Sequence, residues 1–201
     1  MKLILASEFD VSFHKTKEII KSANGNKVVF IPTACYGEGF EPSYKEHIQP
    51  FEDMGMQVVS FDLKGKSEQE VEEVIADAAL IYGGPGNTFY LLEHMNNCNF
   101  QKLLERKLDQ GCIYLGSSAG SIVASPDIGF ISPMDDPSRA NLQDTTGLNF
   151  IDFLFLPHLD HPEMGEDAKT IIRQHDCKSQ TLLALNDDQA VFVNNKVVQV
   201  I

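Results

Sequence analysis

The sequence has 201 residues, of which 43% are hydrophobic and 22% charged, and its formal net charge is −13. This length and composition are typical of one globular domain over residues 1–201. The acidic charge argues against nucleic acid and anionic membranes as partners, and no run approaches the roughly 20 apolar residues that a membrane span needs.

The first residues carry one lysine, Lys2, and only four apolar residues in a row, residues 3–6. A secretory signal requires a longer apolar stretch, so we expect a first strand here and a cytoplasmic protein. The cysteines are scattered without a C-x-x-C spacing, and reduced thiols are expected in such a chain. They are Cys35, Cys98, Cys112 and Cys177. The oligomeric state, monomer or homodimer, stays open.

Short apolar runs alternate with helix-like segments over the first 125 residues. Strands are predicted at 3–6, 27–32, 57–63, 79–82 and 112–115, and helices at 9–23, 44–54, 67–78, 87–95 and 100–110. The segment between 32 and 44 reads as a loop because it contains Gly37 and Gly39. Repeated strand–helix–strand crossovers predict an α/β fold with three layers, a doubly wound and mostly parallel sheet with helices on both faces.

The alternation loosens after residue 126. A loop-rich stretch is expected at 132–148, a strand at 153–156 and a helix at 164–175; short antiparallel strands are expected at 182–185, 190–193 and 197–201. Ligands of open α/β sheets bind outside the carboxyl ends of the strands, and the notable motifs of this chain all fall there.

The segment Gly116-Ser117-Ser118-Ala119-Gly120 matches G-x-S-x-G and lies between a predicted strand and a helix-compatible segment. Such a turn holds its middle serine in a strained conformation with the hydroxyl exposed, and the flanking glycines remove clashing Cβ atoms. Chance could produce the pattern, but the strand-to-helix context is what the motif requires. Ser118 is therefore the predicted nucleophile.

A glycine-rich segment, residues 83–88 with the sequence GGPGNT, follows the fourth predicted strand. It lacks the features of a phosphate-binding loop. It either forms a tight connection capped by Asn87 or Thr88, or it aims a backbone N–H at a tetrahedral oxyanion. Beside a nucleophile turn the second interpretation is favoured, with Gly86 and Ala119 as the donors.

Six histidines compete for the role of general base. His158 follows the buried-looking strand 153–156 and so lies at the edge where Ser118 is expected, and His161 is the alternative. The remaining four lie in polar, helix-like segments and are expected at the surface: His14, His47, His94 and His175.

A carboxylate that orients the histidine completes such a site. Asp135 is preferred, because it lies in the loop between nucleophile and histidine; Asp136 and Glu163 stay open, whereas Asp160 is very near His158 in sequence. An alternative is a metal site in the H-x-D-H-x-E segment formed by His158, Asp160, His161 and Glu163. It would leave the serine turn without a role.

The order strand-GGPGNTF, strand-GSSAGS and strand-PH, together with the closing segment Asp188 to Val191, resembles the peptidase E family, which includes aspartyl dipeptidases and, more distantly, cyanophycinase. The resemblance implies a fold similar to class I glutamine amidotransferases. No cofactor is expected. The resemblance also implies Ser118 as nucleophile, His158 as base, and Gly86 and Ala119 as oxyanion donors. A family acid between nucleophile and histidine supports Asp135 or Asp136.

One departure concerns the substrate. Aspartyl dipeptidases have an arginine soon after a Gly-Glu pair, whereas Ala168 stands near that place here, with Lys169 or Arg173 as substitutes. We therefore expect a serine hydrolase that cleaves small peptides through an acyl-enzyme, and a preference for aspartate is in doubt. The alternatives are a metal-dependent hydrolase and a non-catalytic small-molecule-binding domain.

Overall fold

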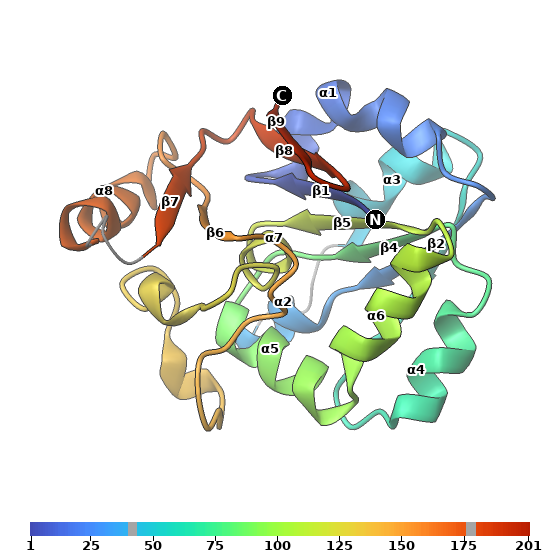
Figure 1. Cartoon of the computed structure of the whole chain (residues 1–201), viewed down its shortest axis with the longest axis horizontal. Helices are drawn as coiled ribbons and strands as arrows, with labels where there is room; N and C mark the ends of the chain where they lie inside the picture. Colours follow the sequence, from blue (N-terminus) through green and yellow to red (C-terminus); the bar gives the residue numbers. More distant parts are fainter. Residues whose placement is uncertain (40–43, 176–179) are drawn as a thin grey trace.

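The computed structural model describes residues 1–39, 44–175 and 180–201, and shows a central open sheet with helices on both faces (Figure 1). Cys177 lies outside the described residues. None of the helices in the described ranges is long and apolar enough to cross a bilayer.

The main sheet has seven strands in the order β3-β2-β4-β5-β1-β8-β9. Neighbouring strands from β3 to β1 are parallel, and β8 and β9 are added antiparallel at one edge. The bounds are β1 Lys2–Ala6, β2 Lys27–Ile31, β3 Gln57–Ser60, β4 Leu80–Gly83, β5 Ile113–Ser117, β8 Ala190–Asn194 and β9 Val197–Val200. The predicted doubly wound, mostly parallel α/β fold is confirmed.

The helices divide between the two faces of the sheet. In Figure 1, α1 (Phe9–Lys21) and α3 (Tyr44–Glu52) lie above it, and α4 (Glu68–Ile75), α5 (Thr88–Asn97) and α6 (Phe100–Asp109) lie below. Alternate residues of each strand point to opposite faces and therefore bury into two separate cores. Ile4 and Phe30 pack with α1 and α3, whereas Leu3 and Val29 belong to the core under the other helices.

A second, two-stranded sheet lies beyond the carboxyl ends of the central strands (Figure 1). It consists of β6 (Phe153–Leu156) and β7 (Thr181–Ala184), which run parallel with Leu156 opposite Ala184. The prediction of an antiparallel strand at 182–185 is wrong. The helix α8 (Gly165–Gln174) connects the two strands, and a helical crossover returns the chain in the same direction.

Three further helical turns shape the surroundings of the sheet edge. The segment after β2 was predicted as a loop, but it contains a short helix, α2 (Thr33–Gly37), so this prediction is wrong. Gly37, one of the two glycines on which the prediction rested, is the last residue of this helix. The loop-rich stretch after the short helix α7 (Ala119–Ile122) contains two 3₁₀ turns, η1 (Gly129–Ile131) and η2 (Pro137–Arg139).

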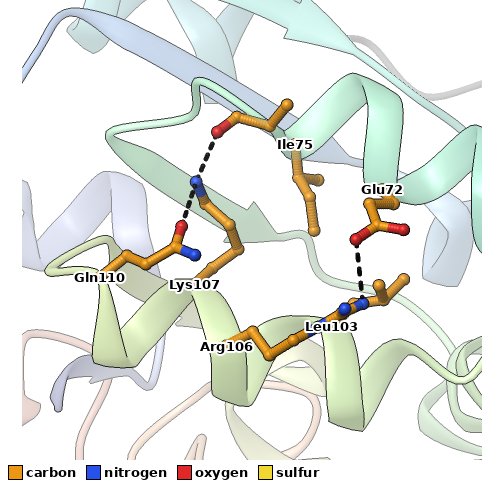
Figure 2. Close-up of a pocket in the computed structure, with 7 residues that line it drawn as sticks. Glu72, Ile75, Leu103, Arg106, Lys107 and Gln110 are labelled. Carbon is orange, nitrogen blue, oxygen red and sulfur yellow. Dashed lines mark hydrogen bonds and ion pairs between the residues drawn. The ribbon is translucent and has the colours of Figure 1, made fainter.

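The helices α4 and α6 lie side by side and leave a pocket of about 230 Å³ between them (Figure 2). Its charged side chains contact one another or the backbone. Arg106 lies 3.2 Å from the Glu72 carboxylate, and the Lys107 ammonium donates to the Ala76 carbonyl and to Gln110. None of the residues that line this pocket belongs to the motifs found in the sequence.

Candidate active site

The carboxyl ends of three adjacent strands, β4, β5 and β1, provide the floor of the site. Because these strands are parallel, the residues that follow each of them meet at one edge. Gly83 ends β4, Ser117 ends β5, and Ser7 and Glu8 follow β1.

Ser118 stands between β5 and α7 with φ of 50° and ψ of −111°, a conformation that residues with a side chain rarely adopt. Its N–H donates to the carbonyls of Ala6 and Ser7 on the neighbouring strand, which holds the strained turn in place. Gly120 approaches β4 so closely that a Cβ there would overlap the backbone oxygen of Gly83. The turn has the geometry that the G-x-S-x-G motif predicts.

His158 comes two residues after β6 and is only 3% exposed. Its Nε2 lies 2.9 Å from the Ser118 Oγ. Its backbone also has a positive φ, 67°, and its N–H donates to the Ser7 Oγ at 2.8 Å. The structure thus brings together the predicted nucleophile and the predicted base.

Asp187, which the sequence analysis missed, lies against the other ring nitrogen, with Oδ1 2.7 Å from the His158 Nδ1. The Ser7 hydroxyl donates to the same oxygen at 3.2 Å, and the backbone N–H of Asp187 donates to Asp160. A carboxylate at Nδ1 fixes the tautomer in which Nδ1 carries the proton and Nε2 accepts one from the serine. Ser118, His158 and Asp187 therefore form one chain of hydrogen bonds.

Asp135 makes no hydrogen bond or ion pair with His158. The prediction that Asp135 orients the histidine is therefore wrong, because Asp187 occupies that place. The Asp135 carboxylate accepts the backbone N–H of Thr88 at 2.8 Å, at the start of α5. The first N–H groups of a helix lack intrahelical acceptors and attract carboxylates, which explains the position. Burial raises the pKa of Asp135 to about 6, against the lowering effect of its hydrogen bonds with Thr88; nearby Glu38 adds to the rise.

The other two candidate acids are engaged elsewhere. Asp136 accepts the Ser138 N–H and so caps η2, and this contact lowers its pKa. Glu163 is exposed, and its backbone N–H donates to the ring of His161.

The predicted metal set is not assembled either. The Asp160 carboxylate accepts the backbone N–H of Asp187. The His161 Nδ1 accepts the backbone N–H groups of Glu163 and Met164, just before α8. Within the described ranges, the metal-binding groups that converge are those of Glu8, His158 and Asp187. Both nitrogens of His158 are already hydrogen-bonded, to Ser118 and Asp187.

Gly86 and Ala119, the predicted oxyanion donors, lie near the nucleophile in different ways: Gly86 lines its pocket, and Ala119 follows it in sequence. Gly86 lines the same pocket as Ser118 and has a φ of 129°, which suits glycine. Ala119 is the first residue of α7, so its N–H has no acceptor within the helix. Asn87 caps α5 through the Tyr90 N–H and donates to the Asp136 carbonyl, so the interpretation as a capped connection also holds.

A pocket of about 280 Å³ opens above the serine. Its lining includes three carboxylates, two histidines and two methionines, and consists of Glu8, Glu38, His47, Pro85, Gly86, Ser117, Ser118, Met134, Asp135, His158 and Met164. His47 was expected at the surface but is half-buried in this wall; His94, also expected at the surface, is buried.

A serine on a strained strand-to-helix turn, bonded to a histidine that a carboxylate holds, is the arrangement of a serine hydrolase. The chain belongs to peptidase family S51, whose model matches residues 3–201. It is thus a serine peptidase related to peptidase E.

Individual proteins are similar to this chain over most or nearly all of its length. An uncharacterized peptidase of Listeria monocytogenes is 30% identical over 98% of this chain and 96% of its own. The crystal structure of a peptidase E candidate from the same species has a TM-score of 0.90 at 29% identity, covering 99% of this chain and 96% of the other. A probable alpha-aspartyl dipeptidase of Drosophila melanogaster is 30% identical over 76% of this chain and 60% of its own.

Proposed function

We propose that this chain hydrolyses the amide bond of short peptides through an acyl-enzyme on Ser118. His158 acts as general base and then as general acid, and Asp187 orients it. The backbone N–H groups of Gly86 and Ala119 stabilise the oxyanion. The pocket volume of about 280 Å³ is just below the range of roughly 300–1,000 Å³ for small-molecule sites, which favours a small peptide as substrate.

In the first half of the reaction, the Ser118 Oγ attacks the carbonyl carbon while its proton passes to the His158 Nε2. The carbonyl oxygen becomes an oxyanion, and donors that are already oriented stabilise it without reorganisation. The Asp187 carboxylate stabilises the imidazolium that forms and keeps the Nδ1 proton. The tetrahedral intermediate then loses its amine, which takes the proton from Nε2 as the C–N bond breaks.

In the second half, a water molecule attacks the ester carbonyl. His158 removes one proton from this water and delivers it to the departing Ser118 oxygen, so that the serine hydroxyl is restored and a carboxylic acid is released. The residues used are the same in both halves.

The observation that carries this proposal is the continuous chain from the Ser118 Oγ to the His158 Nε2 at 2.9 Å and from the His158 Nδ1 to the Asp187 Oδ1 at 2.7 Å. Two of these residues have a positive φ, which costs on the order of 1–3 kcal/mol each and persists only where the surrounding structure enforces it. Such strain is concentrated at active sites.

The test is covalent labelling with a small alkyl fluorophosphonate followed by intact-mass and peptide analysis. The wild-type protein is expected to gain one adduct, on Ser118, and to hydrolyse at least one dipeptide of a broad panel. Ser118→Ala should lose both. Ser121→Ala is the matched control: this buried hydroxyl donates to the Ala6 carbonyl behind the turn, and its removal should leave the adduct on Ser118. A folded protein that takes no label and cleaves no dipeptide would contradict the proposal.

A further inference from the structure

The charge of the pocket beside Ser118 is one-sided. Its lining contains the carboxylates of Glu8, Glu38 and Asp135, and no lysine or arginine is among the described residues that form it. His47 is the other histidine of the lining besides His158, and its Nδ1 already lies 3.3 Å from a carboxylate oxygen of Asp10. An acidic ligand would therefore meet repulsion from several directions.

Two of these carboxylates have no counter-ion. Within the described part of the chain, Glu8 and Glu38 take part in no side-chain hydrogen bond or ion pair. Asp135 has the Thr88 N–H as its donor, but no cation. Glu8 also offers an oxygen within 4.8 Å of the ligand atoms of His158 and Asp187, so the negative charge extends to the reacting centre.

The cations that sequence analysis offered for an acidic substrate are engaged on α8. Lys169 pairs with Glu166 at 2.7 Å, and Arg173 donates to the Thr170 hydroxyl. Neither is part of the pocket lining, and Ala168 is fully buried in the core. Binding an aspartate side chain requires a local cation, which the described lining does not supply.

We propose that this pocket selects peptides whose residue on the acyl side of the scissile bond carries a positive charge, lysine or arginine, and that it rejects aspartate. The inference rests on the proposed function for the position of the substrate, because the acyl group must reach Ser118. A cationic side chain in the pocket is attracted by carboxylates that are otherwise uncompensated, and a carboxylate side chain is repelled by them. The specificity is opposite to that of an aspartyl dipeptidase.

The first experiment compares lysyl-leucine, norleucyl-leucine and aspartyl-leucine as substrates of the wild-type protein. Norleucine has nearly the length of lysine without its charge, so the ratio of the first two isolates electrostatics. We expect kcat/KM for the lysyl peptide to exceed that for the norleucyl peptide by about tenfold and that for the aspartyl peptide by at least about a hundredfold. The lysyl preference should shrink as salt is raised from 0.05 to 0.5 M, by roughly threefold, because salt screens exposed charges.

The variant that tests the origin of the preference is Glu38→Gln. It should lower the ratio of lysyl to norleucyl kcat/KM by about three- to fivefold, because Glu38 is an exposed member of the wall. Glu105→Gln removes the same charge from an exposed position on α6 and should leave the ratio unchanged. Glu38→Arg should raise aspartyl cleavage relative to lysyl cleavage. Equal ratios in all variants would overturn the inference.

Binding to the Ser118→Ala protein separates this inference from the proposed function. By calorimetry, lysinamide should bind at least about fivefold more tightly than norleucinamide, and the α-amide of aspartic acid, which keeps its side-chain carboxylate, should bind more weakly still. If the wild type is labelled on Ser118 but cleaves aspartyl-leucine as well as lysyl-leucine, the hydrolase stands and the charge selection fails. If lysinamide binds with a dependence on Glu38 but no peptide is cleaved and no label is taken, the charge selection stands and the hydrolase fails.

Discussion

Two pockets of the described chain, one between α4 and α6 and one above Ser118, are similar in size and opposite in chemistry. The pocket between α4 and α6 has a volume of about 230 Å³, and its charged groups contact one another or backbone oxygens (Figure 2). The pocket above Ser118 has about 280 Å³, and it contains a nucleophile bonded to its base and carboxylates without counter-ions in the described chain. Volume therefore does not identify the active site; reactive and unpaired groups do.

The largest effect on the reactivity of Ser118 is expected from Asp187, and Asp135 is the carboxylate to compare it with. Asp187→Asn replaces the acceptor at the His158 Nδ1 by an amide that can favour the wrong tautomer. We expect the second-order rate of fluorophosphonate labelling, and kcat for a neutral dipeptide, to fall by about 10³- to 10⁴-fold. Asp135→Asn makes the same chemical change against the Thr88 N–H and should leave the labelling rate within about tenfold. Similar losses in both variants would return the orienting role to Asp135.

The contrast between these two acids shows what the sequence could predict. The G-x-S-x-G turn is local: its strand, serine and glycines are contiguous, so Ser118 could be placed from residues 112–120 alone. His158 also follows a recognisable buried strand. The site acid depends instead on how two strands pair, which no local pattern specifies.

Asp187 was missed because the sequence analysis predicted the wrong direction for β7, antiparallel instead of parallel. His158 stands two residues after β6, and Asp187 stands three residues after β7. With Leu156 opposite Ala184 in a parallel pair, both residues leave the same edge of the small sheet. An antiparallel β7 would carry Asp187 to the opposite edge. A helix expected between the two strands already indicated a parallel crossover and would have identified the residue.

The pH dependence of stability offers a second way to test the comparison, because the active-site pocket contains a carboxyl group, Asp135, whose pKa is raised by burial. In the folded protein burial raises the pKa of Asp135 to about 6 from 3.8, so the protonated form is favoured by folding. Its stabilising effect is complete below about pH 3.8 and is lost as the pH rises through about 6. Relative to wild type, Asp135→Asn should gain up to about 2 kcal/mol in unfolding free energy between pH 4 and pH 7.

Urea unfolding of both proteins at several pH values measures this difference. The asparagine can still accept the Thr88 N–H, so the hydrogen bond itself is retained. A difference between the two proteins that stays constant from pH 4 to pH 7 would show that Asp135 titrates as an ordinary carboxyl group.

A smaller effect on the labelling rate and on stability is expected from the substitution of Ser7, which is hydrogen-bonded to both His158 and Asp187. Its hydroxyl accepts the His158 N–H at 2.8 Å and donates to Asp187 at 3.2 Å, and the residue is fully buried. Ser7→Ala leaves a buried N–H without its acceptor, at a cost of about 1–2 kcal/mol in unfolding free energy. Because the histidine is held less firmly, labelling of Ser118 should slow by about tenfold.

Ser12→Ala is the matched control for this variant, since Ser12 is also fully buried and its hydroxyl donates to the carbonyl of Glu8, the residue before α1. It should lower the unfolding free energy by a similar amount without slowing the labelling. Equal labelling rates in both variants would mean that Ser7 acts on stability alone.

The smallest effect belongs to the pocket between α4 and α6, where Glu72→Gln removes one partner of the ion pair with Arg106. The two side chains are 56% and 46% exposed, so water and salt screen their attraction. The unfolding free energy should change by less than about 0.5 kcal/mol, with a double-mutant cycle through Arg106→Gln isolating the pair. Labelling of Ser118 should not change. A loss of labelling in Glu72→Gln would mean that the pocket between α4 and α6 affects the reactivity of Ser118. The two pockets could then no longer be treated as independent, one structural and the other catalytic.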